Sequence, residues 1–129
     1  MIFRQLARRL FGLGMLTALP TSALAPQFDW NNPVTLTGIV TTVEWANSRA
    51  YACIDVRDAA GATANWTLEL GSPNVLVTRY GWTATLLKQG DRVTADGWQA
   101  KDGEKHMSVR SVTVMNGKEF FAAHGENNE

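Results

Sequence analysis

Polar side chains alternate with apolar ones along two short segments, residues 50–57 and 63–70. Tyr51 and Asp55 fall on the polar side of the first segment, and Glu69 falls on the polar side of the second. A phenol ring can stack on a sugar or a base, and carboxylates accept hydrogen bonds from hydroxyl groups. These three side chains are therefore candidate ligand contacts, if the two segments are neighbouring strands. The commoner role of such a polar face is to meet solvent.

The turn before the first of these segments contains a fourth candidate contact. It reads Asn47-Ser48-Arg49, and the planar guanidinium of Arg49 is suited to pairing with an anionic group. The alternative is that Asn47 and Ser48 only form the turn and that Arg49 is solvated.

The chain has five tryptophans, which is many for its length. Alternation places Trp66 in the core, and we expect the same of Trp45. The other three, Trp30, Trp82 and Trp98, stand beside turn signals. Such aromatic side chains either close the end of a barrel or form a patch for a partner protein. We take Trp82 and Trp98 as candidate partner-facing anchors.

The residues that bind metals or act as nucleophiles are few and scattered. A set of Cys, His and Met suits copper, but His106 precedes a predicted strand and His124 lies in the C-terminal tail. No local spacing brings either one to Cys53, so we predict no metal site and no cofactor. Cys53 and His106 are also the one nucleophile and base pair worth considering, and the spacing supplies no third, orienting group. We therefore expect a protein that is not an enzyme.

Residues 1–25 have the layout of a cleaved secretory signal peptide. Three arginines precede an apolar run over 10–19, which is too short for a permanent membrane anchor. Small residues then offer cleavage after Ala25 or, alternatively, after Ala23. We expect a periplasmic or secreted protein.

The remainder, 26–129, is long enough for one domain with a frayed C-terminal tail at 124–129. It carries nine basic and twelve acidic residues, a formal charge of −3 that argues against nucleic acid as a partner. Cys53 is the one cysteine, so no intramolecular disulfide can form, and we expect its thiol to be buried or, alternatively, to bridge two chains.

The periodicity of the chain predicts a mainly β fold. Its expected strands are 33–45, 50–57, 63–70, 92–98, 107–115 and a short 119–122. The apolar phase of the first strand changes at Gly38, which indicates a bulge or bend. Aligning the apolar faces of the second and third strands places Ile54 opposite Trp66 and Tyr51 opposite Glu69.

A helix is expected between the third and fourth strands. Ser72 followed by Pro73 is a helix-start signal, and Gly81 would end the helix. A second short helical turn is predicted over 83–88. The predicted order is three strands, a helix and two strands. This is the order of the oligonucleotide- and oligosaccharide-binding (OB) fold, a small five-stranded Greek-key barrel.

The chain also resembles a family of small exported bacterial proteins classed as a domain of unknown function. The resemblance rests on Phe28-Asp29, PVTLTGIVTTVEWAN, IDVRDAAG, NWTLELGSPNVLVTRYGW, LKQGDRV and MSVRSVTVMNGKEFF. Members of that family carry His-His-Ser before the Phe-Asp pair and Asn-Pro-His in the first loop. This chain has Ala25-Pro26-Gln27 and Asn47-Ser48-Arg49 there instead. If those histidines bind metal in relatives, this chain is not expected to bind it in the same way.

Together, these features predict a periplasmic binding or interaction module for a small polar ligand or a protein partner. The alternative is an accessory protein for periplasmic copper or redox chemistry.

Overall fold

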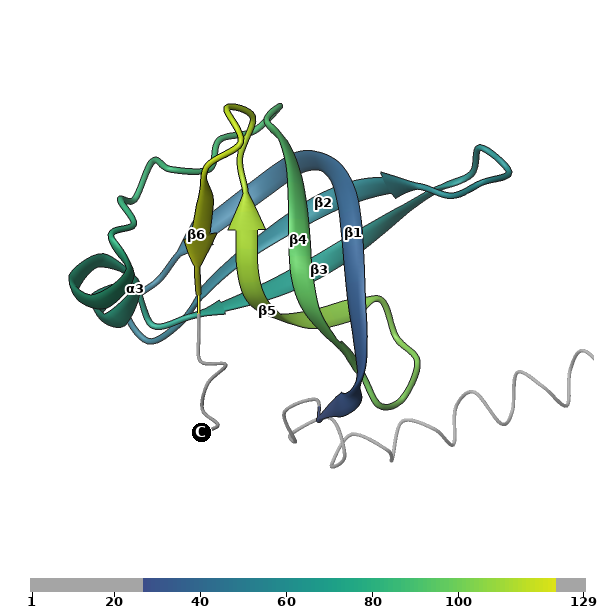
Figure 1. Ribbon diagram of the computed structural model, residues 1–129, viewed down its shortest axis with the longest axis horizontal. Helices are drawn as coiled ribbons and strands as arrows, with labels where there is room; N and C mark the ends of the chain where they lie inside the picture. The colour runs from purple at the N-terminus through teal and green to yellow at the C-terminus, as the bar shows by residue number, and fades with distance from the viewer. Residues whose placement is uncertain (1–26, 123–129) are drawn as a thin grey trace, which may run out of the picture.

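The computed structural model describes residues 27–122, and the predicted signal peptide and C-terminal tail lie outside that range. The described chain is mainly β, as predicted (Figure 1). Its elements are β1 (Phe28–Trp45), β2 (Ala50–Arg57), β3 (Thr63–Gly71), α3 (Pro73–Tyr80), β4 (Arg92–Ala100), β5 (His106–Thr113) and β6 (Glu119–Phe121).

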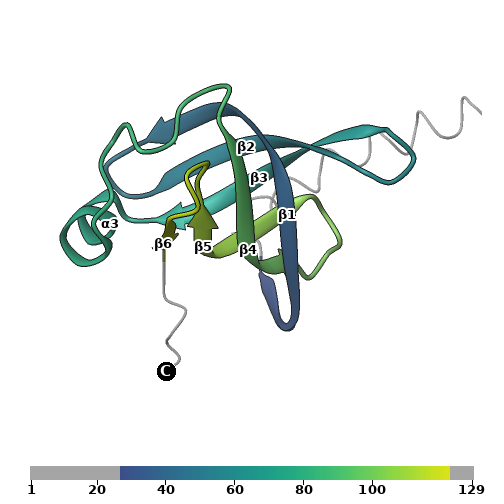
Figure 2. The same cartoon turned by 45° about the horizontal axis from the view of Figure 1, so that its top comes forward.

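Five of the strands close into a barrel. β1 pairs with β2 and β4, β2 pairs with β3, and β4 pairs with β5, all antiparallel. A short parallel pairing of β3 with β5 completes the ring, while β6 lies outside it and pairs with β5 (Figure 2). This connectivity confirms the predicted OB-like Greek-key barrel.

The first strand curves over the barrel (Figure 1). Gly38 lies where this strand passes from one partner to the other. Gly38 pairs with Val93 of β4 and with Val56 of β2. A Cβ atom at this position would lie 2.3 Å from the carbonyl oxygen of Asp55, so only glycine fits. The predicted bend is present, and the bulge itself falls at Thr41, where the register with β2 shifts.

The β2–β3 hairpin has the predicted register. Ile54 lies opposite Trp66, and Tyr51 lies opposite Glu69. The inward side chains include Ile54 and Leu68, which are fully buried. The polar side chains of both strands therefore lie on the outside of the barrel.

The helix between β3 and β4 begins and ends where predicted. The Ser72 hydroxyl accepts a hydrogen bond from the amide of Val75, and Gly81 adopts a left-handed conformation with a φ of 79°. The predicted second helical turn over 83–88 is wrong, because the segment forms turns. Leu87 is buried there. Just after this segment, the amide of Gly90 donates to the carbonyl of Val40, which ties the chain to β1.

Trp82 belongs to the core, and the prediction that it faces a partner is wrong. Its side chain is 2% exposed, and its ring stacks near Trp45 at 6.5 Å and meets Phe120 edge-on at 6.2 Å. The indole Nε1 donates a 2.8 Å hydrogen bond to the carbonyl of Phe121. Trp82 thus has the other role considered for it and closes one end of the barrel.

No helix within residues 27–122 is long and apolar enough to cross a membrane.

We expect Trp82→Phe to lower the free energy of unfolding by about 1–3 kcal/mol, because it leaves the part-buried hydrogen bond to the Phe121 carbonyl unmade and removes packed atoms. Urea unfolding followed by circular dichroism measures the change. The matched control is Trp30→Phe, since Trp30 is 59% exposed, and its effect should stay within about 0.5 kcal/mol. Equal losses in the two variants would contradict the core role of Trp82.

Candidate functional site

One row of side chains crosses the outside of the barrel and contains three of the predicted site residues. Tyr51 pairs with Glu69, Glu69 with Ser108, and Ser108 with Trp98. Neighbouring strands are about 4.8 Å apart, so this outer row spans roughly 15 Å from Tyr51 to Trp98. Between Glu69 and Trp98 the row holds only the short side chain of Ser108.

His106 lies in the adjacent row, opposite Thr67, at the start of β5. Its Nε2 atom is buried and has no hydrogen-bond partner. The nearest acid is Glu69, whose Oε1 lies 3.7 Å away, within ion-pair range but beyond a hydrogen bond. A buried nitrogen without a partner is uncommon in folded proteins. His106 therefore holds a buried Nε2 atom without a hydrogen-bond partner beside the outer row.

The predicted loop cation and the predicted strand acid are brought together. Arg49 contacts Glu69 through its Nη1 atom and the Oε2 oxygen, and the Arg49 side chain is 48% exposed. Glu69 is much less exposed, at 16%. Its two oxygens therefore face different bases, Arg49 on one side and His106 on the other.

Asp55 lies apart from this centre. It faces Asn65, whose side-chain nitrogen donates a 2.8 Å hydrogen bond to the Asp55 carboxylate. Asn65 and Glu69 are four residues apart on β3, about 13 Å along the strand. Asp55 and Glu69 are therefore not a pair of carboxylates acting on one bond.

An aromatic cluster adjoins the other end of the outer row. The rings of Trp30 and Trp98 meet edge-on at 5.1 Å, and Phe28 lies 6.0 Å from Trp30 and 5.6 Å from the ring of His106. Trp30 is 59% exposed. His106 thus joins an aromatic half, made by Phe28, Trp30 and Trp98, to a polar half centred on Glu69. Sequence reasoning missed the place of Phe28 in this cluster, although Phe28 belongs to the Phe-Asp pair on which the family resemblance rests.

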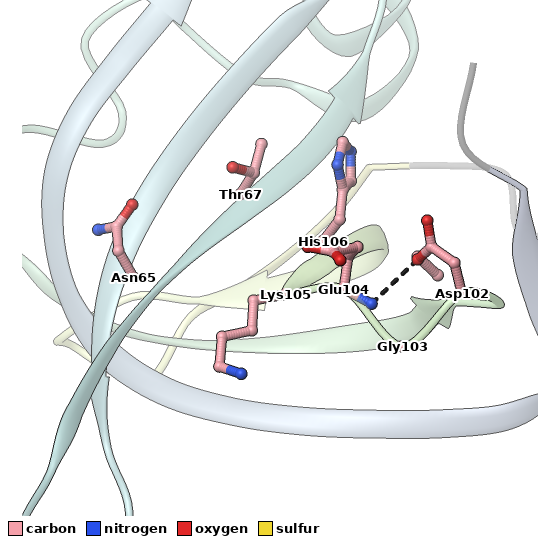
Figure 3. Close-up of a pocket in the computed structure, with 8 residues that line it drawn as sticks. Asn65, Thr67, Asp102, Gly103, Glu104, Lys105 and His106 are labelled. Carbon is pink, nitrogen blue, oxygen red and sulfur yellow. Dashed lines mark hydrogen bonds between the residues drawn. The ribbon is translucent and has the colours of Figure 1, made fainter. Parts of the chain in front are cut away.

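An open hollow of about 500 Å³ lies beside His106, between β3 and the loop that joins β4 to β5 (Figure 3). Its lining residues are Asn65, Thr67, Ala100, Asp102, Gly103, Glu104, Lys105 and His106. The loop is held by a hydrogen bond from the amide of Glu104 to the side chain of Asp102, drawn in Figure 3. The hollow is mainly polar, so it suits a hydrophilic group.

Cys53 lies in the row of His106 and not in the core, so the expectation of a buried thiol is wrong. It pairs with Thr67, and its side chain is half-buried on the outside of the barrel. The Sγ atom lies 3.9 Å from the Thr67 hydroxyl. Within residues 27–122, no three His, Cys, Asp or Glu side chains lie close enough together to hold a metal ion.

We expect Cys53 to react with a small thiol reagent in the folded protein, because its side chain is on the outside of β2. Iodoacetamide labelling followed by intact mass spectrometry should show one adduct without denaturant, and Cys53→Ser should show none. Labelling that requires denaturant would place the thiol in the core and contradict this position.

The comparisons with known proteins give a family and no function. No curated protein matches the chain. The model of one family, described as a family of unknown function (DUF6152), matches residues 15–109, which include β1 to β4 and the first part of β5. This match confirms the resemblance to a domain-of-unknown-function family, and the chain belongs to DUF6152.

Proposed function

We propose that this protein is an exported binding module, without catalytic activity, that holds a small polar ligand against the outside of its barrel. The observation that carries the proposal is the outer row, in which Tyr51, Glu69 and Trp98 share one register line beside the unpartnered Nε2 of His106. Export is supported by the signal-like sequence of residues 1–25.

The proposed ligand is a saccharide. A sugar ring has one apolar face, which suits the exposed ring of Trp30 and its neighbour Trp98. It also has hydroxyl groups, which suit Glu69 and the neighbouring Tyr51. OB barrels bind oligosaccharides or oligonucleotides on the face of their second and third strands. The formal charge of −3 over 26–129 favours the saccharide over the nucleic acid.

Two distances favour binding over catalysis. Asp55 is bound to Asn65 and lies about 13 Å along the sheet from the row of Glu69, far beyond the 5–9.5 Å that separates the carboxylates of glycosidases. Cys53 and His106 are separated by Thr67 in their row, about 10 Å across two strand spacings. Neither pair is within reach of one reacting bond.

The rival proposal is an accessory role in periplasmic metal or redox chemistry. It is supported by Cys53 and His106 lying in one cross-strand row. Metal ligands sit about 2.0–2.3 Å from an ion, so side chains two strands apart do not share one without rearrangement. We therefore rank this role second. A protein partner in place of the saccharide remains the third outcome of the experiment below.

Native mass spectrometry of the protein, exported to a bacterial periplasm and purified without chelator, separates these roles. We expect a mature mass that lacks residues 1–25 or 1–23, and an adduct with the mass of an organic ligand. A stoichiometric copper adduct would favour the metal role instead. A bare monomer that also fails to bind saccharides would favour a protein partner.

A saccharide panel titrated against the labelled protein by NMR tests the surface. We expect shifts at Tyr51, Glu69 and His106, and a loss of affinity of about tenfold in Trp98→Ala, because base and sugar stacking contributes about 1–3 kcal/mol. Arg49→Glu combined with Tyr51→Ala should also weaken binding. The control is Arg79→Gln, an exposed charged residue on α3 and outside the outer row. Binding that survives all of the site variants would show that this surface is not the site.

A further inference from the structure

A second hollow lies where β1 parts from β2. β1 pairs with β2 over 38–45 and with β4 over 28–39, so residues 33–37 have no partner on their β2 side. The β2–β3 hairpin continues beyond that point and projects from the barrel (Figure 1, Figure 2). The two segments therefore diverge and leave a hollow between them.

This hollow has a volume of about 490 Å³ and an apolar floor. Leu36 comes from β1, Val56 from β2, and Ala64 and Trp66 from β3, and all four line the hollow and remain partly exposed. Leu36, Val56 and Trp66 also pack against the core of the barrel. An apolar surface in the mouth of a barrel is a common place for a ligand.

The charged side chains that line the hollow are mostly cationic. Arg57 and Lys105 both line it, both are exposed, and neither forms an ion pair within the part of the chain that the structure describes. The one acid in the lining, Asp58, uses its Oδ1 atom to accept hydrogen bonds from the amides of Ala60 and Ala62. The carboxylate of Asp58 is thus turned to its own loop.

We call the hollow lined by Leu36, Val56, Trp66, Arg57 and Lys105 the barrel mouth. We propose that it binds a free single-chain amphipathic carboxylate, a fatty-acid-like molecule of medium length. Its alkyl chain would lie on Leu36, Val56 and Trp66, and its carboxylate would pair with Arg57 and Lys105. The charge complementarity selects an anion, and the apolar floor selects an alkyl chain over a sugar.

The barrel mouth is separate from the proposed saccharide site. Trp66 faces the inside of β3, whereas its neighbours Asn65 and Thr67 face the outside and line the polar hollow. Lys105 lines both hollows, but Arg57 lines the barrel mouth alone. This proposal therefore does not depend on the function proposed above.

The probe is decanoate below its micellar concentration, titrated into the mature protein by calorimetry, with decanol and acetate as partial ligands. We expect decanoate to bind at least tenfold more tightly than either one. Arg57→Gln should weaken decanoate binding by about two- to fivefold, and the double variant with Lys105→Gln by about tenfold. Ala64→Phe, which fills the hollow without changing charge, should abolish binding.

The matched control is Arg79→Gln with Lys88→Gln, which removes two exposed cations distant in sequence from the barrel mouth and should leave affinity unchanged. Thermal unfolding of every variant verifies the fold.

Equal affinity for decanol and decanoate, or unchanged binding in the Arg57 and Lys105 double variant, would overturn the proposal. So would binding to vesicles of anionic phospholipid without binding to monomeric decanoate, because the occupant would then be a membrane surface.

Discussion

The barrel closes through one short parallel pairing, that of β3 with β5, and the candidate site depends on it. The pairing joins Thr67, Leu68 and Glu69 to His106, Met107 and Ser108. Its inward members, Leu68 and Met107, are fully buried, so the closure is held by the core. Its outward members set His106 beside Glu69 and place Ser108 between Glu69 and Trp98. Without this closure the polar and aromatic halves of the surface would belong to separate sheet edges.

The curved first strand has two consequences of its own. It gives β2 and β4 a common neighbour, and the close approach at Gly38 lets the strand serve both. Since β1 leaves β2 at Gly38, the rest of the hairpin runs on without it. The same geometry therefore completes the barrel and leaves the barrel mouth that Trp66 lines.

The polar centre of the outer row contributes little to the stability of the fold. The Arg49–Glu69 pair is partly exposed, and such pairs contribute about 0–1 kcal/mol. The unpartnered Nε2 of His106 opposes stability, because a buried nitrogen loses its bonds to water on folding.

The sequence by itself determined the elements that depend on neighbouring residues. Alternation marked the strands, the Ser72-Pro73 start and the Gly81 end bounded the helix, and the matched apolar faces of β2 and β3 set the register that puts Tyr51 opposite Glu69. It also singled out Arg49, Tyr51, Asp55, Glu69 and Trp98, because loop and strand positions follow from local pattern. These signals act over a few residues, within one turn or one hairpin.

Only the tertiary structure decided which distant segments meet. Trp82 stands beside a turn signal, yet it is buried because α3 and β6 converge on it. Cys53 is outside because alternation along β2 gives the inside to Ala52 and Ile54, which is a signal that the sequence already carried. His106 and Glu69 are 37 positions apart and meet through a parallel pairing that no local pattern encodes. The physical reason is that barrel closure is cooperative, so the position of each side chain depends on strands far away in the chain.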